Sequence, residues 1–310
     1  MKTMKNLVLS FMLVMLTTGC VATYQPPLNA ENRAKINNLE AVTLVAQEEI
    51  DVQFIPSMAG ASAGASYGII GALVGSAIDA SINDTRSKEA EIRAKPDRDM
   101  LLGYDYRPVL NEAVAKQVAG VQWTGDIIVT QDVQVEDFDV MTYQGQARDG
   151  IVFINSSYAL SPAQDMVFVK AYIAVHERVD NPEGDKKLKN KPMAAWTLQY
   201  QSPARNDILN SYTEDDVQVD VRWDRDALIQ ELVRGADHLG YLAKFTLDDG
   251  LTKEEYLLKE QTMLVGPAKT EGKGFYLGEY DGNKIYRLGS GALHSVPADE
   301  GVAVNFLMAQ

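Results

Sequence analysis

Two overlapping G-x-S-x-G strings surround Ser62 and Ser66. This pattern can place a nucleophilic serine on a sharp turn between a strand and a helix. Here both strings lie in a run of small residues with glycine at nearly every fourth position, so composition alone produces the match. A helix interior cannot present a strained serine, and we therefore expect no catalytic serine in this segment.

The other residues able to do acid–base or metal chemistry are few and poorly spaced. His176, His238 and His294 show neither H-x-x-x-H nor H-E-x-x-H spacing, so each is expected to be structural or exposed. The acid-rich stretches 214–216 and 220–226 lack the alternating ligands and the glycine of a calcium loop. The sequence predicts no catalytic residue, no cofactor and no metal site, hence a protein that is not an enzyme.

Composition excludes further classes of function. The chain has 310 residues, with 29 Lys and Arg against 43 Asp and Glu, and a net charge of −14. That charge disfavours a nucleic-acid partner, which requires a basic surface. The single cysteine excludes an internal disulfide framework and a cysteine-rich metal site.

The first twenty residues have the layout of a secretory signal. Lys2 and Lys5 precede an apolar run at 7–16 (LVLSFMLVML), which is too short to span a bilayer and fits a signal h-region. Small residues and the cysteine follow at 17–20 (TTGC). This segment resembles the lipobox of bacterial lipoproteins, although Thr17 stands where that family usually has leucine.

The resemblance implies that residues 1–19 are removed and that Cys20 is acylated. Two or three acyl chains give stable attachment to a bilayer, since each buried methylene contributes about 0.8 kcal/mol. In this family an aspartate after the cysteine favours retention in the inner membrane. Val21 therefore implies the outer membrane, with the protein anchored in lipid and facing the periplasm.

A stripe of glycines follows the tether. No charged residue occurs from 52 to 78, and at 100° per residue five glycines fall within a helical sector of about 80°. They are Gly60, Gly64, Gly68, Gly71 and Gly75. Each costs a helix about 1 kcal/mol relative to alanine, a cost that close packing of another backbone can offset. The pattern resembles the glycine-zipper segments of bacterial envelope proteins.

Two interpretations of the stripe stay open. The helix either inserts into a membrane or self-associates, or it packs its flat face on the protein's own sheet. We expect it to continue as a charged helix to about Ala94 and to stop before Pro96. Three acid–base pairs at i,i+4 support the charged half. They are Asp84/Lys88, Glu89/Arg93 and Glu91/Lys95.

The pattern of apolar residues in the rest of the sequence predicts an α+β fold. We expect a mostly antiparallel sheet with two packing helices, 106–119 and 224–244, preceded by the long glycine-striped helix and followed by a β-rich C-terminal segment. The expected strand runs are 126–130, 139–143, 150–158, 166–176 and 194–201. Two hairpins are expected, one joining 166–177 to 194–201 and one joining 275–280 to 284–288. The cluster Tyr104-Asp105-Tyr106-Arg107 is either a docking edge or a packing element.

The predicted organisation has five segments. They are a signal peptide (1–19), a lipidated tether with a short hairpin of 42–45 and 52–55 (20–50), the glycine-zipper helix with its charged extension (51–96), an α+β periplasmic domain (97–265) and the β-rich C-terminal segment (266–310).

Three functions are compatible with these patterns. The first is a non-enzymatic outer-membrane lipoprotein that binds an envelope protein or itself and serves protein interaction or envelope assembly. The second is a subunit of an oligomeric membrane channel or a secretion accessory, in which striped helices satisfy their backbone groups among themselves. The third is an enzyme acting on an envelope polymer, which requires a cleft with paired acids.

Overall fold

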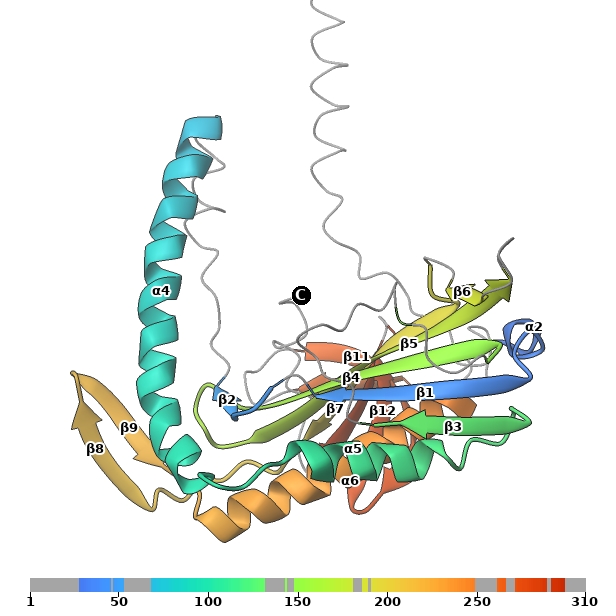
Figure 1. Ribbon diagram of the computed structural model, residues 1–310. Coiled ribbons are helices and arrows are strands. Elements are labelled where there is room, and N and C mark those ends of the chain that lie inside the picture. Colours follow the sequence, from blue (N-terminus) through green and yellow to red (C-terminus); the bar gives the residue numbers. More distant parts are fainter. Residues whose placement is uncertain are drawn as a thin grey trace, which may run out of the picture.

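The computed structural model describes residues 28–45, 47–52, 68–131, 143, 148–180, 186–188, 191–248, 261–265, 271–288 and 291–298. A large mixed sheet carries helices along one face (Figure 1). The helices are α2 (Ala30–Arg33), α4 (Gly68–Met100), α5 (Arg107–Val118) and α6 (Arg225–Asp248). The strands are β1 (Asn38–Val45), β2 (Asp51–Val52), β3 (Asp126–Thr130), β4 (Gly150–Leu160), β5 (Val167–Asp180), β6 (Lys186–Leu188), β7 (Ala194–Gln201), β8 (Asn210–Glu214), β9 (Val217–Val221), β10 (Gln261–Val265), β11 (Glu271–Tyr280), β12 (Asn283–Leu288) and β13 (Leu293–Pro297).

The sheet has the order β10-β11-β12-β13-β7-β5-β4-β1-β3, with β2 beside β4 and β6 beside β5. The β8–β9 hairpin forms a separate two-stranded sheet. Four of the pairings are parallel, those of β1 with β3 and β4, β2 with β4, and β13 with β7. The predicted α+β class is confirmed, and the described sheet is mixed with a majority of antiparallel pairings.

Strand β1 corrects the prediction of a short hairpin in the tether. β1 lies between β3 and β4, and β2 pairs with the far end of β4. Within the described residues, 42–45 and 51–52 therefore do not pair with each other, while 53–55 lie outside them. The reason is burial on both faces, because seven of the eight residues of β1 are buried, as is usual for a parallel inner strand.

The C-terminal strands join the same sheet. β11 and β12 form the predicted hairpin, with Asp281 and Gly282 at positive φ of 44° and 79° in its turn. β13 then pairs with β7 in parallel, from Leu293↔Leu198 to Ser295↔Tyr200. This parallel pairing places the last described strands next to the inner strands of the sheet.

Helices α5 and α6 pack against each other and on one face of the sheet. Asp224 caps α6, since its Oδ1 accepts the N–H of Ala227 at 2.8 Å. Leu228, Leu232 and Leu239 of α6 are fully buried in the main core. The two predicted helices are thus the elements that cover the sheet.

Helix α4 extends away from the sheet (Figure 1). Its 33 residues correspond to about 50 Å. The expected stop before Pro96 is wrong, because α4 continues through this proline to Met100. Proline removes one helical hydrogen bond, but side-chain contacts to the last turns, described below, hold the backbone in place.

The face of the sheet opposite α5 and α6 holds a buried ion pair. Glu40 of β1 lies 3.4 Å from Arg178 of β5, and both side chains are almost fully buried. The Glu40 carboxylate also accepts hydrogen bonds from Tyr143 (2.8 Å) and Thr130 (3.0 Å). These polar contacts offset the cost of burying the charges.

Candidate functional site

The structure brings a serine, a histidine and an aspartate together at the junction of α6 with the C-terminal strands. Oγ of Ser295 on β13 lies 2.8 Å from Nδ1 of His238 on α6. Nε2 of His238 lies 3.6 Å from a carboxylate oxygen of Asp281 in the β11–β12 turn. These are the residue types of a hydrolytic triad, and we call them the Ser–His–Asp cluster.

Surrounding side chains fix each member of the cluster. Asn283 donates its amide N–H to Ser295 Oγ at 3.1 Å. The His238 ring contacts the rings of Tyr200 and Tyr280, with centroids 4.8 Å and 5.0 Å away. Arg234 donates to the Asp281 carboxylate at 3.1 Å, one helical turn before His238.

The cluster is closed to substrate in this structure. The side chains of Ser295 and His238 are both fully buried. Burial, followed by the nearby Arg234 cation, lowers the pKa of His238 to about 4, so its imidazole is neutral and only weakly basic at pH 7. A general base needs a reachable nucleophile and a pKa near the working pH. The arrangement is suited to joining α6 to β12 and β13.

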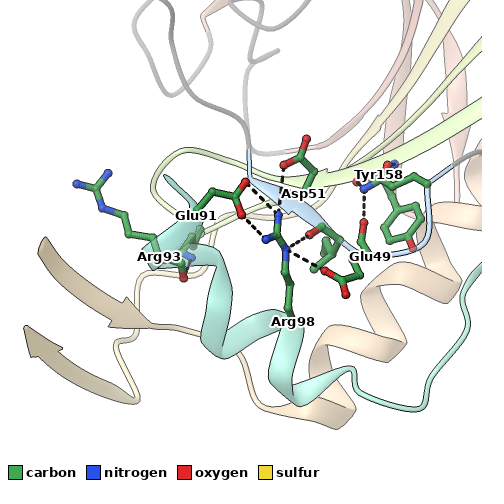
Figure 2. A network of polar contacts seen from close by, with 9 residues as sticks. Glu49, Asp51, Glu91, Arg93, Arg98 and Tyr158 are labelled. Carbon is green, nitrogen blue, oxygen red and sulfur yellow. Dashed lines mark hydrogen bonds and ion pairs between the residues drawn. The ribbon is translucent and has the colours of Figure 1, made fainter. Parts of the chain in front are cut away.

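A second polar network fixes the base of α4 (Figure 2). Arg98 forms a bidentate contact with Glu91 two helical turns earlier and donates to the Ile50 carbonyl at 2.9 Å. The same guanidinium lies 3.8 Å from Glu49 and 3.7 Å from Asp51. Three carboxylates and one carbonyl therefore converge on Arg98 and tie α4 to the start of β2.

Asp97, the residue before Arg98 in the same helical turn, is buried. Asp97 is 1% exposed and accepts a hydrogen bond from Gln164 at 3.1 Å, while its second carboxylate oxygen has no hydrogen-bond partner. Gln164 also donates to the carbonyl of Arg93, and its own carbonyl accepts from the indole of Trp223 at 2.7 Å. Burial raises the pKa of Asp97 to about 7.

The acidic stretch 214–216 lies beside the C-terminal turns of α4. Glu214 forms an ion pair of 2.8 Å with Lys95 of α4, and Asp215 and Asp216 form the β8–β9 turn. The predicted pairs Asp84/Lys88 and Glu89/Arg93 are present, at 2.7 Å and 3.4 Å. Across the part of the chain described here, no group of three or more acidic, histidine or cysteine side chains could hold a metal ion.

The cluster at 104–107 acts in packing within the described structure. Tyr106 is buried, donates to the Leu232 carbonyl at 2.6 Å and makes an edge contact with Tyr158. Arg107 forms ion pairs with Asp105 (2.9 Å) and Glu48 (3.0 Å). These contacts connect α5 to α6 and to the loop before β2.

The remaining predicted residues divide between described and undescribed parts of the chain. Gly68, Gly71 and Gly75 lie in the first half of α4, where helical geometry puts them within a sector of about 60°. Cys20, Gly60, Gly64, Ser62 and Ser66 lie outside the described residues, as do 1–19 and most of the run 139–143. His176 and His294 are buried on β5 and β13.

Sequence reasoning missed Ser295, Asp281, Asp97 and Arg98. Glu91 and Arg98 are two helical turns apart, so a search for ion pairs at i,i+7 would find them. Lys95 lies four residues after Glu91, at the more common i,i+4 spacing, and is therefore the predicted partner. The Ser–His–Asp cluster joins residues separated by up to 57 positions, and no local pattern reveals it.

Two further findings concern the similarity of the chain to known proteins and the apolar length of its helices. No protein-family model, curated protein or solved structure matches this chain. Of the helices within the described ranges, none has both the length and the apolar run needed to cross a bilayer.

Proposed function

We propose that this protein is a non-enzymatic lipoprotein, anchored in the outer membrane through acylated Cys20 and facing the periplasm, that presents a glycine-striped helix for close packing with other helices. The α+β body serves as the rigid base of that helix. The proposed role is protein interaction or envelope assembly, and the proposed partner is a second copy or another envelope protein.

The observation that carries the proposal is the continuity of α4. One helix connects the positions of Gly68, Gly71 and Gly75 to the network around Arg98 and Asp97. Its main contacts with other elements are to β2 and β9. A helix that is fastened at one end and carries a side-chain-free stripe near the other is suited to receive a second backbone.

The sealed Ser–His–Asp cluster also favours a non-enzymatic role. Ser295 is fully buried beside a weakly basic histidine, so the one triad-like arrangement found in the described structure has a clear packing role. The anchor rests on the lipobox-like sequence at 17–20 and on Val21.

Site-specific disulfide trapping tests the helix-packing role. If Cys20 is acylated, an introduced cysteine is the only free thiol in the mature chain. Ala72 flanks the glycine stripe, whereas Ala80 lies on the opposite side of the helix. Oxidation of native membranes should therefore cross-link Ala72→Cys and leave Ala80→Cys uncoupled.

The mass of the cross-linked product identifies the class of partner. An adduct of twice the chain mass indicates self-association, and another mass indicates an envelope partner. Adding Gly71→Leu should reduce the Ala72→Cys adduct at least tenfold, while Ala80→Leu should leave it unchanged. Equal adducts from both cysteine positions, or none from Ala72→Cys, would contradict helix packing.

The anchor is tested separately by Cys20→Ser. We expect this variant to move from the membrane fraction to the soluble periplasmic fraction, and mass spectrometry of the wild-type N-terminal peptide to show acyl groups on the cysteine. An unmodified thiol in the mature wild-type protein would contradict the lipoprotein assignment.

A further inference from the structure

A row of polar and aromatic side chains crosses six strands on the sheet face opposite α5 and α6. Its members occupy directly opposed positions in the strand registers. In order from β4 to β11 they are Ser157, Lys170, Gln199, His294, Tyr286 and Tyr276. We call this set the cross-strand row.

The middle of the row contains buried polar atoms that lack partners. Gln199 and His294 are both fully buried. The amide oxygen and nitrogen of Gln199 and both ring nitrogens of His294 have no hydrogen-bond partner. Leaving such a group unsatisfied destabilises the folded state, so four such atoms on neighbouring strands require an explanation.

A cation lies at one side of this unsatisfied pair. Lys170 of β5 is directly opposed to Gln199, and burial lowers the pKa of its ammonium group to about 8. Burial together with the Lys170 charge lowers the pKa of His294 to about 3. At neutral pH the row therefore offers an ammonium, an amide and a neutral imidazole, all of which can donate a hydrogen bond.

One end of the row reaches solvent. Ser157 is exposed, and so is Asn155 two residues earlier on the same face of β4. Tyr172, two residues after Lys170 on the same face of β5, is 40% exposed. Side chains on both sides of the β4 end of the row are therefore in contact with solvent.

We infer that the cross-strand row is a binding site for a small anion, whose carboxylate or phosphate oxygens lie between Lys170 and His294. The Gln199 amide N–H and one imidazole N–H of His294 donate to the anion, and Lys170 balances its charge. An anion supplies acceptors for the Gln199 amide N–H and for the His294 ring N–H, which lack them, and hydrogen bonds to a charged acceptor are stronger than those between neutral groups. The inference does not depend on the proposed membrane anchor or on helix packing.

Thermal unfolding of the full chain in defined salts tests this site. The probes are sodium acetate and sodium phosphate, each compared with sodium chloride at equal ionic strength. We expect acetate, phosphate or both to raise the melting temperature with a saturable dependence on concentration, because a ligand that binds the folded state stabilises it. Acetate alone would identify a carboxylate site, and phosphate alone a phosphate site.

Three variants separate a binding site from a structural one. Lys170→Gln should weaken binding of the effective anion at least tenfold, whereas the exposed Lys88→Gln should not change it. Gln199→Leu should abolish the anion effect while raising the melting temperature in chloride, because it removes a buried amide without partners. A merely structural Gln199 would instead give a lower melting temperature in chloride.

Nuclear magnetic resonance of the His294 ring nitrogens gives a direct readout. The effective anion should shift one ring nitrogen in the wild type and leave His238 unchanged. If neither anion stabilises the protein more than chloride and neither shifts His294, ordered water alone satisfies the row and the inference is overturned.

Discussion

The hydroxyl of Ser295 lies 2.8 Å from Nδ1 of His238, and both side chains are fully buried between β13 and α6. This contact joins the last described strand to the longest helix of the body. Asn283 and Tyr280 add contacts from the β11–β12 hairpin to the same point. The C-terminal hairpin is therefore held to α6 by specific polar contacts as well as by sheet pairing.

Replacing Ser295 should lower the stability of the fold, because we expect its role to be structural and not catalytic. Ser295→Ala leaves the buried Nδ1 of His238 without a partner, which should lower the free energy of unfolding by about 1–3 kcal/mol in urea titrations. The exposed Ser211→Ala serves as the control and should change stability by less than about 0.5 kcal/mol. Labelling of Ser295 in the folded wild type by a fluorophosphonate would show that the serine is accessible and would contradict the packing role.

Asp97 should make stability fall as pH rises. Its pKa is about 7 in the folded protein and about 4 in an unfolded chain, so between these values the folded state holds more protons. The contribution of this group to stability is therefore greatest below pH 4 and is lost progressively up to about pH 7.

Asp97→Asn should remove that dependence. The amide oxygen can still accept the hydrogen bond from Gln164, while no charge is buried. We expect the melting temperature of the variant relative to wild type to rise between pH 5 and pH 8. Aspartate at position 99, an exposed neighbour in the same helix turn, provides the control variant Asp99→Asn. A constant difference between Asp97→Asn and wild type across this range would contradict the assignment.

Arg98 should control how firmly α4 is attached to the body. Arg98→Ala removes the contacts to Glu91 and to the Ile50 carbonyl together. Because the carboxylates are more than half exposed and screened by water, we expect a loss of about 1–2 kcal/mol. Hydrogen exchange of the last turns of α4 should become about tenfold faster.

The matched control for Arg98 is Lys88→Ala. Lys88 forms an exposed i,i+4 pair with Asp84 on the same helix, and such a pair contributes only about 0.5 kcal/mol. Exchange in the last turns should remain unchanged in this variant. Equal changes in hydrogen exchange for the two substitutions would contradict a special role of Arg98 in attaching α4.

Local sequence patterns were sufficient for elements whose partners are near in sequence. Helix α6 follows from its apolar period and its Asp224 cap, and the β11–β12 hairpin follows from Asp281-Gly282. The sequence predicts a tether where strand β1 lies, because the partners of β1 begin at positions 126 and 150 and parallel pairing leaves no turn signal.

The candidate site was harder to predict than the fold. Glu91 was expected to pair with Lys95, yet Arg98 binds Glu91 and Lys95 binds Glu214, 119 positions away. Tertiary contacts also overrode the local preference of Pro96 to end α4. The partners of buried polar groups such as Asp97 depend on which loops cover them, which spacing along the chain does not encode.

The close contact of α5 with α6 depends on Gly240. A Cβ added at this position would lie 2.7 Å from the backbone oxygen of Ala113 and 3.0 Å from a side-chain carbon of Gln117. Since a backbone carbonyl in a packed helix cannot shift freely, overpacking should cost about 2–3 kcal/mol, against a gain of about 1 kcal/mol in helix propensity. Gly240→Ala should therefore lower the free energy of unfolding by about 1–2 kcal/mol.

Gln230→Ala is the control for this prediction, because Gln230 is exposed on the same helix and its replacement changes propensity but not packing. Denaturant titration of both variants should give a clear loss for Gly240→Ala and little change for Gln230→Ala. If Gly240→Ala is as stable as wild type or more stable, helix propensity outweighs the contact, and α5 and α6 are packed less tightly than the 2.7 Å separation indicates.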